Sequence, residues 1–550
     1  MGNLLSRARL ALKALLELNA EYKTVEARLK RSPGLPVAHP TMSFWTVPPA
    51  PIANHRPEVL PSHADVVIVG SGITGAAAAW TLLAYAVSRP LTVIMLEARE
   101  TCSGATGRNG GHINPPLFHD YSELKEAHGV EDAQKIIRLR LAHLGELMQV
   151  ADEVGAREHS QIREVESLDV FYDLGTFEHE KRALEAWRAD MPEEAHGVYA
   201  LDGSQAIEKF QLATQTRGCI VTPAGAAHPY RLVTSVLSTL LKKHHDRFYL
   251  STRTPVTAIT PPAESPYYSV QTPRGLLTTP HIIHATNGWS GHLLAPLRMK
   301  ILPVRGLMSA QRPGTSMESA MRSGGRAHIF NSGPLGYDYL TQLPTGEHEL
   351  MFGGGAAQAG RAILPEVGET DDGGYNMGIA AHVAGALPEY FGRDNWGQEG
   401  VPPTGGSSEV QWAAGRVKAL WTGVLGISAD GLPWVGRLPE KVAGRSAPQR
   451  RAAPAARAAQ GSSSQCSEKA GAPRSADAED EPLTAAPGEW ISAGYSGEGM
   501  VHAWMSGRAV ATMLLGAERE GRLNEWFPDV FRVSENRWKR ATLERLMDRL

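Results

Sequence analysis

Three glycines with the spacing Gly-x-Gly-x-x-Gly are the residues of this chain whose pattern most directly implies chemistry. Gly70 permits a tight turn, Gly72 lets the backbone approach a pyrophosphate, and Gly75 lets a helix pack closely on a strand. The N-terminus of that helix presents N–H groups and the positive end of its dipole to phosphates. A dinucleotide-binding loop is therefore predicted over Gly70-Ser71-Gly72-Ile73-Thr74-Gly75.

The segments around this loop are those that such a site requires. Residues 65–69 are predicted as a buried parallel strand and residues 76–83 as a helix. A second strand over residues 91–96 ends in Glu97, 22 residues after Gly75, where a carboxylate would accept hydrogen bonds from ribose hydroxyls. Together these elements predict a Rossmann-like unit in an α/β fold.

A second glycine-rich loop, residues 103–111, follows almost at once. It holds four glycines and Arg108, as a loop lying against phosphates or a flavin ring would need. The dinucleotide motif alone does not separate FAD from NAD.

Composition limits the other classes of function. The chain has 550 residues, with 55 Lys and Arg against 58 Asp and Glu, and this net charge of −3 argues against a nucleic-acid-binding protein. Three cysteines make neither a disulfide framework nor a zinc site, so we expect no metal centre, a reducing compartment and a cytoplasmic location. No signal peptide is visible. Residues 66–88 carry no charge, but their glycines favour a strand, turn and helix over a membrane span.

Beyond these features, the sequence resembles the FAD-dependent oxidoreductases of the D-amino-acid oxidase superfamily. The run Gly107-Arg108-Asn109-Gly110-Gly111 is similar to the amine-oxidase branch, and to its γ-glutamylputrescine oxidases in particular. The resemblance continues through residues 254–259, 281–289, 303–306, 430–436 and 494–500. It implies an α/β fold, α+β overall, in which a Rossmann-like FAD-binding domain is interleaved with an antiparallel-sheet substrate domain.

The resemblance also implies which residues hold the cofactor. The FAD-binding set comprises Gly70, Ser71, Gly72, Ile73, Thr74, Gly75, Glu97, Ala98, Thr106, Arg108, Asn109, Gly110, Gly111, Val256, Ala285, Thr286, Gly288, Gly431, Gly494, Gly497, Glu498, Gly499 and Met500. Relatives with covalent flavin use a late cysteine or a histidine in the second loop. Here Cys466 lies in a low-complexity stretch and Arg108 takes the histidine position, so we expect non-covalent FAD.

In such relatives an amine C–H bond gives a hydride equivalent to flavin N5, and the protein mainly orients the amine. Four residues are candidates on the substrate side. Arg305 could pair with a substrate carboxylate or form a structural salt bridge. Tyr337 and Tyr339 alternate on one strand face, as pocket or core aromatics, and His112 could approach the flavin or be structural.

Several readings of function stay open. The chain is predicted to oxidise the C–N bond of a small amine or amino acid. It could instead be an FAD-linked 2-hydroxy-acid dehydrogenase of the same fold, or a non-catalytic flavoprotein scaffold. Residues 349–354 lack the lysine that sarcosine-oxidase-like relatives carry, which leaves O2 or another carrier as the electron acceptor.

Two segments stand outside the resemblance. Residues 1–31 are predicted to form a helix with one apolar seam and a net charge of +4. This pattern fits a helix packed on the protein, a helix that binds a partner, or weak contact with a membrane surface. Residues 1–6 also loosely fit a myristoylation pattern. Residues 441–488 contain no aromatic residue and are predicted to be a disordered insertion. The predicted organisation is an N-terminal helix (1–31), a proline-rich arm (32–63), an FAD-binding domain (64–150, 215–300, 405–440 and 489–516), a substrate domain (151–214 and 301–404), the insertion (441–488) and a C-terminal helical tail (517–550).

Overall fold

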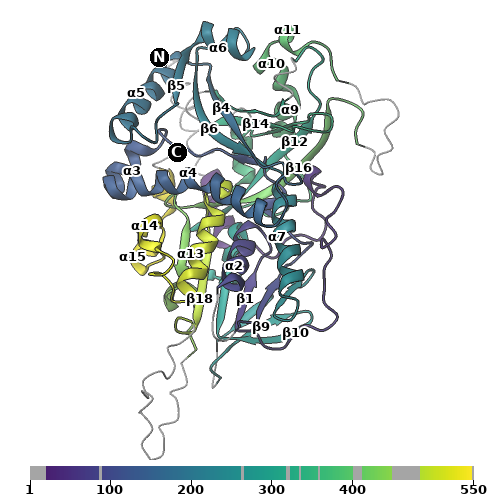
Figure 1. The fold of residues 1–550 in the computed structure, drawn as a ribbon, viewed down its shortest axis with the longest axis vertical. Helices are drawn as coiled ribbons and strands as arrows, with labels where there is room; N and C mark the ends of the chain where they lie inside the picture. Colours follow the sequence, from purple (N-terminus) through teal and green to yellow (C-terminus); the bar gives the residue numbers. More distant parts are fainter. Residues whose placement is uncertain are drawn as a thin grey trace, which may run out of the picture.

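In the computed structural model the residues described are 20–85, 90–261, 265–317, 323–332, 336–356, 360–400, 412–448 and 484–547. Across these ranges, two large sheets lie one above the other along the long axis of the molecule (Figure 1). The α/β fold with a Rossmann-like domain and a second, mainly antiparallel sheet is confirmed.

The lower sheet in Figure 1 is built around strand β1 (Val66–Val69), whose four β-branched residues are all buried. Val66 and Ile68 pack with the helices on one face, while Val67 and Val69 pack with a small sheet on the other. Six described strands form this sheet, parallel except at β17, in the order β17 (Trp434–Arg437), β18 (Gly488–Ala493), β11 (His281–His284), β1, β2 (Val93–Leu96), β7 (Phe248–Ser251). The small sheet is formed by β10 (Gly275–Thr279), β9 (Tyr268–Thr272) and β8 (Ala258–Thr260).

Helix α2 (Ile73–Ala84) packs tightly between β1 and helix α13 (Ala503–Leu514). A Cβ on Gly75 would stand 2.1 Å from the Gly70 carbonyl oxygen, and a Cβ on Gly507 would stand 2.6 Å from that of Thr74. Because neither approach leaves room for a side chain, these two glycines set how close the helix lies to its neighbours.

The upper sheet carries the second half of the molecule (Figure 1). Its described strands run in the order β16 (Val417–Ser428), β12 (Ile301–Gln311), β15 (Leu350–Gly353), β14 (Tyr337–Gln342), β13 (Arg326–Asn331), β4 (Arg163–Phe171), β6 (Gly218–Ala226), β3 (His112–Ile113), with β5 (Tyr199–Asp202) also on β6. All these pairings are antiparallel except that of β13 with β4.

The remaining α-helices surround the two sheets. They are α3 (Tyr121–His128), α4 (Val130–Glu153), α5 (Leu174–Asp190), α6 (Gly203–Phe210), α7 (Pro229–Lys243), α8 (Ser290–Leu293), α9 (Met377–Gly385), α10 (Leu387–Phe391), α11 (Arg393–Trp396), α12 (Glu440–Ala443), α14 (Leu523–Trp526), α15 (Glu535–Arg540) and α16 (Leu543–Met547).

Three predicted domain ranges need correction. Residues 64–150, 215–300 and 405–440 were expected in the FAD-binding domain, but β3, β6 and β16 lie within them and belong to the upper sheet. The strands β6 and β16 are long and pair antiparallel over most of their length, β6 with β4 and β16 with β12. The amphipathic pattern of a strand does not reveal which sheet completes it.

The N-terminal segment packs on the body of the protein where it is described. Residues 20–30 are helical, and Tyr22, Val25 and Leu29 contact a cluster that includes Leu302 and Leu543. This part of the predicted apolar seam is therefore covered by protein, and the first nineteen residues lie outside the described ranges.

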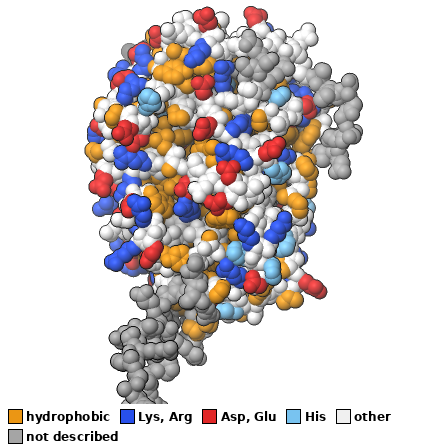
Figure 2. Space-filling view, viewed as in Figure 1, with side chains coloured by type: hydrophobic (Ala, Val, Ile, Leu, Met, Phe, Trp, Pro, Cys, Tyr) orange, Lys and Arg blue, Asp and Glu red, His pale blue; other side chains and the backbone are white. Residues whose placement is uncertain are grey.

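The molecular surface in Figure 2 mixes charges of both signs. On the face drawn, Lys and Arg side chains are interspersed with Asp and Glu, as the near-zero net charge suggests. No helix among the described residues has both the length and the apolar character needed to cross a membrane.

The insertion predicted over residues 441–488 extends too far at both ends. Residues 441–448 are folded: Val442 is fully buried, and Arg445 bonds to the buried Glu489 at 2.6 Å. Residues 484–488 also pack, because Ala485 N–H donates to the Leu514 carbonyl and Gly488 belongs to β18. The rest of the predicted insertion, residues 449–483, lies outside the described residues.

Two deletions should therefore behave differently. Replacing residues 449–483 by a short Gly/Ser linker should preserve flavin content and the thermal midpoint, because this stretch has little apolar surface to bury. Deleting 441–488 should lower the midpoint by several degrees, since it also removes Val442 and the partner of the buried Glu489 carboxylate. Thermal unfolding followed by flavin fluorescence measures both; equal midpoints for the two deletions would contradict the correction.

Candidate functional site

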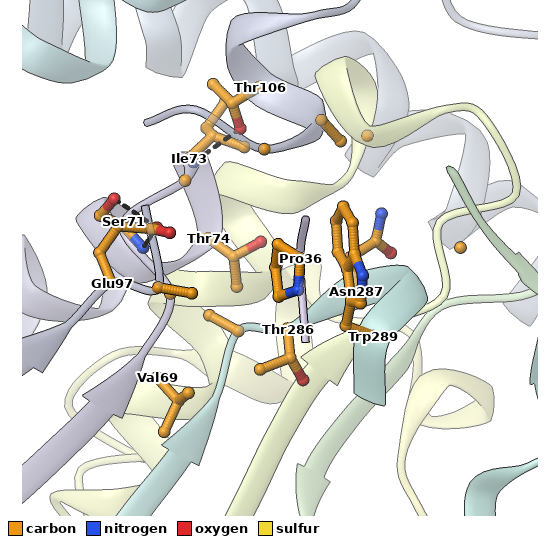
Figure 3. A pocket seen from close by; sticks show the side chains of 18 of the residues that line it. Pro36, Val69, Ser71, Ile73, Thr74, Glu97, Thr106, Thr286, Asn287 and Trp289 are labelled. Atoms are coloured by element: carbon orange, nitrogen blue, oxygen red, sulfur yellow. Dashed lines mark hydrogen bonds between the residues drawn. The ribbon is translucent and has the colours of Figure 1, made fainter. Parts of the chain in front are cut away.

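The glycine motif opens a deep cavity at the carboxyl ends of β1, β2 and β11 (Figure 3). This dinucleotide cavity has a volume of about 1250 Å³, including its mouth. Gly70 has φ +110°, and a Cβ there would stand 2.5 Å from the Ala285 carbonyl oxygen, so the turn requires glycine. Gly72, which precedes the first residue of α2, faces the cavity, as a pyrophosphate site needs.

Glu97 projects into the same cavity from the end of β2 (Figure 3). Its carboxylate accepts hydrogen bonds from Ser71 N–H at 3.1 Å and Ser71 Oγ at 2.7 Å, and from Arg99 N–H at 3.1 Å. These bonds fix the carboxylate between the motif turn and the next loop. It is positioned to accept from the hydroxyls of a ribose.

The second glycine-rich loop forms another wall. Thr106 Oγ1 accepts from Ile73 N–H at 3.0 Å, which joins the loop to the start of α2 (Figure 3). Arg108 was expected among the phosphate-binding residues, but its buried guanidinium bonds instead to the carbonyl oxygens of Ser103, Thr41 and Thr422 at 2.6–2.9 Å. It therefore fastens this loop to the arm and to β16. Burial lowers the pKa of Arg108 to about 10, so the group remains charged at neutral pH.

The C-terminal segment 494–500 closes the cavity from the side of α13. Tyr495 hydroxyl lies 2.8 Å from the hydroxyls of both Thr74 and Ser492, and burial raises the pKa of this phenol, so it stays neutral. Asn287, three residues after the end of β11, accepts from Gly494 N–H at 3.1 Å. Gly497, Gly499 and Met500 line the cavity beyond this point.

The proline-rich arm contributes a wall that the sequence did not predict. Gly34, Leu35 and Pro36 line the dinucleotide cavity, and Figure 3 shows Pro36 beside Trp289. Nothing in the spacing of Gly34-Leu35-Pro36 signals a ligand. The arm is held there by Thr41, whose N–H donates to the Asp372 carbonyl oxygen at 2.7 Å. The carboxylate of the same buried Asp372 accepts from Arg99 at 2.8 Å.

A second cavity adjoins the first, over the upper sheet. It has a volume of about 1630 Å³, including its mouth. Five residues line both cavities: Ala105, Asn109, Leu425, Gly497 and Met500. The two spaces therefore meet between the second glycine-rich loop, β16 and the C-terminal segment.

Three of the four predicted substrate-side residues line this second cavity. Tyr337 and Tyr339 lie on the same face of β14, with ring centroids 6.5 Å apart, and the His112 ring is 5.7 Å from that of Tyr339. His112 Nε2 bonds to the Leu340 carbonyl oxygen at 2.9 Å. Burial lowers the pKa of His112 to about 4, so the ring is neutral at pH 7. With Nε2 donating to a carbonyl, Nδ1 is left as an acceptor.

Arg305 does not belong to either cavity. Its guanidinium donates to Glu366 at 2.6 Å and 3.2 Å and to the Asp371 carbonyl oxygen at 2.7 Å. Of the two roles that the sequence left open for Arg305, the structure shows the structural salt bridge, because these acceptors already hold the group.

The other predicted cofactor residues fall into three groups. Those lining the dinucleotide cavity are Gly70, Ser71, Gly72, Ile73, Thr74, Glu97, Ala98, Thr106, Asn109, Val256, Ala285, Thr286, Gly497, Gly499 and Met500. Arg108, Gly110 and Glu498 line the second cavity. Gly75, Gly111, Gly288, Gly431 and Gly494 line neither, and several of them meet neighbouring backbone instead: a Cβ on Gly288 would stand 2.6 Å from the Leu425 carbonyl oxygen.

Comparison with known proteins agrees with this geometry. The profile of the DAO family, FAD dependent oxidoreductase, matches residues 65–513. The chain therefore belongs to the DAO family of FAD-dependent oxidoreductases. A search of curated proteins gave no match.

Solved structures show the same fold at low sequence identity. Glycine oxidase from Geobacillus kaustophilus aligns with a TM-score of 0.56 and 17% identity, over 86% of this chain and 99% of that one. L-Amino acid deaminase from Proteus myxofaciens gives 0.57 and 13%, over 90% and 97%. Iminodiacetate oxidase from Chelativorans sp. BNC1 gives 0.55 and 14%, over 84% and 98%.

The residues present fit FAD, the family's cofactor. The glycine turn at the start of α2 suits the pyrophosphate, and Glu97 suits the ribose. The indole Nε1 of Trp289, which lines the cavity, is buried without a hydrogen-bond partner in the described structure, as expected where a polar ligand completes the site. The junction with the second cavity is where a flavin ring would face a substrate.

A side chain at Gly72 should abolish FAD binding. A Cβ there already stands 3.0 Å from Thr106 Oγ1, so the bulk of a valine would occupy the space beside the helix N-terminus. Purified Gly72→Val protein should lack the flavin absorbance of the wild type. Gly145→Val is the matched control, because a Cβ at this exposed position of α4 meets nothing within 4 Å; full flavin content in Gly72→Val would disprove the placement.

The flavin should also be released by acid. Cys102 and Cys219, the described cysteines, are buried, line neither cavity, and have thiol pKa values raised by burial, so neither is a nucleophile for the flavin. Acid precipitation should leave the yellow colour in the supernatant. Flavin that stays with the pellet would show a covalent bond.

Proposed function

We propose that this protein oxidises the C–N bond of a small amine or amino acid. The observation that carries the proposal is the junction of the two cavities, where a flavin placed by the first would face a ligand held in the second. Bound FAD would supply the acceptor for a hydride equivalent from the substrate carbon, leaving an imine that water hydrolyses. The electrons are then consumed by O2 or another acceptor.

The chain's own residues would bind and orient the amine. His112 Nδ1 is an acceptor that can take a hydrogen bond from an amine N–H, whereas a pKa near 4 makes it too weak a base to remove a proton at neutral pH. Burial also raises the pKa of the Tyr339 phenol, which therefore keeps its proton and can donate to a lone pair. Tyr337 extends the aromatic wall on which an alkyl chain can pack.

The structures aligned above support the proposed substrate class. A glycine oxidase, an L-amino acid deaminase and an iminodiacetate oxidase share this fold and, by their names, act on amino compounds. A substrate carboxylate, whether of a 2-hydroxy acid or of an amino acid, would need a cation, and Arg305, the candidate for that role, is held by Glu366, which favours an amine without a carboxylate.

Anaerobic reduction of the bound flavin tests the proposal. Holoprotein mixed with primary amines, secondary amines and amino acids should lose its flavin absorbance with at least one of them, while 2-hydroxy acids should leave it unchanged. The same compounds mixed with free FAD are the control. Reduction by a hydroxy acid alone would favour the alternative enzyme, and reduction by none of the panel, in protein that dithionite does reduce, would contradict the proposal.

A further inference from the structure

The second cavity is long in one direction. Its floor crosses the upper sheet along one row of paired residues. Met308 on β12 and Tyr339 on β14 both pair with Gly353 on β15, the strand between them. Tyr339 then pairs with Ile329 on β13, and Ile329 pairs with Asp169 on β4. Four inter-strand steps of about 4.8 Å make this row ~19 Å long. The β12 end of the row borders β16, which carries Leu425, one of the five residues shared with the dinucleotide cavity, and Asp169 lies at the opposite, β4 end of the row.

Polar atoms at this opposite end lack partners. Asp169 is buried, its Oδ2 lies 3.0 Å from His119 Nε2, and its Oδ1 has no hydrogen bond within the described structure. Asn114 Oδ1 and Asn331 Nδ2, which line the same cavity, are also buried without partners there. Buried polar atoms are rarely left unpaired in proteins, so a ligand that supplies donors is expected here.

The charges around Asp169 favour a cation. Asp120 and Glu498 also line the cavity, and Glu180 on α5 interacts electrostatically with both Asp169 and His119. Arg140 pairs with two of these carboxylates, Asp120 and Glu498, and His119 pairs with Asp169 when it is protonated. Among the described ion pairs, neither Asp169 nor Glu180 has an arginine or lysine partner, so this end of the cavity suits a cation better than an anion.

The arginines in and beside the cavity are not available to a substrate carboxylate. Arg140, next to the lining residue Asp120, donates to both of its oxygens at 2.8 Å and to the Pro116 carbonyl at 2.9 Å. Arg108, which lines the cavity, is held by carbonyl oxygens, as described above. Both guanidinium groups are thus already used, whereas Asp169 Oδ1 and Asn114 Oδ1 have no partner in the described structure.

We propose, on the basis of the amine oxidation proposed above, that Asp169 and Asn114 form a second subsite that binds an ammonium group, so that the substrate is an amine carrying a second amine. The reacting amine lies at the His112 and Tyr339 end, and the distal ammonium donates to Asp169 Oδ1 and Asn114 Oδ1. Asn331 Nδ2 donates to a lone pair elsewhere on the same molecule. The subsite selects a dication over a monoamine of equal length, because only the dication satisfies these acceptors.

Matched ligands separate the subsite from the reaction. Linear α,ω-diamines of increasing length are compared with the n-alkylamines of the same length, each titrated into oxidised holoprotein and followed by the change in the flavin spectrum. The diamine of best length should bind about 10-fold or more tightly than its monoamine. The same pairs are then used in anaerobic flavin reduction.

Two variants test the residues. Asp169→Asn keeps an oxygen for His119 but removes the charge, and should cancel most of the diamine's advantage while lowering monoamine affinity by a much smaller factor. Glu166→Gln is the matched control: it makes the same charge change on β4, three residues away and therefore on the other face, where its side chain is exposed. Asn114→Ala should weaken diamine binding by a smaller factor and provides a second variant if Asp169→Asn loses flavin.

The outcomes separate the two proposals. Equal binding of diamines and monoamines by the wild type, or an equal loss of both in Asp169→Asn, would overturn the subsite. Diamine-selective binding without flavin reduction by any amine would uphold the subsite and contradict the proposed oxidation. Reduction by amino acids or monoamines with no diamine preference would uphold the proposed oxidation and contradict the subsite.

Discussion

The carboxylate of Asp372 has no exposed surface and lies between two buried arginines. Arg99 follows strand β2 and Arg108 sits in the second glycine-rich loop, so one buried charge holds both loops. The Asp372 carbonyl also accepts from Thr41 in the arm and lies 3.1 Å from the Thr422 hydroxyl on β16. A buried carboxylate is tolerated because its partners are so complete, and loss of any one would leave an uncompensated charge. The walls of both cavities depend on this cluster.

The two large sheets contribute different kinds of groups to the candidate site. The lower sheet and α2 supply glycine turns and a helix N-terminus, whose backbone groups suit phosphates. The upper sheet supplies side chains from β12, β14, β13 and β4, which suit a varied organic ligand. Backbone groups would therefore hold the cofactor, and side chains on a rigid sheet would determine which substrate binds.

The sequence predicted the residues of the dinucleotide cavity far better than those of the second cavity. Gly70, Gly72 and Glu97 follow from local rules, because a turn, a helix start and a strand end lie within one short stretch. Tyr337 and Tyr339 were placed on one strand face by their alternation. For Arg305 the sequence could not decide between a substrate carboxylate and a structural salt bridge, because its partner Glu366 lies sixty-one residues away and no spacing rule reveals it. Asp169 was missed for the same reason: a single acid in a strand has no signature until its neighbouring strands are known.

The lower sheet is completed by residues from the far end of the chain. Strand β18 inserts between β11 and β17, and α13 packs on α2 through Gly507. Until residue 493 has been synthesised, β11 has no neighbour on that side, and until residue 514 the alanine face of α2 lacks α13. Domains normally fold as the ribosome releases them, N-terminal part first. Here the nucleotide fold is completed by residues made long after the glycine motif, so a nascent chain that has not reached them would expose apolar surface and depend on chaperones for longer than the position of that motif suggests.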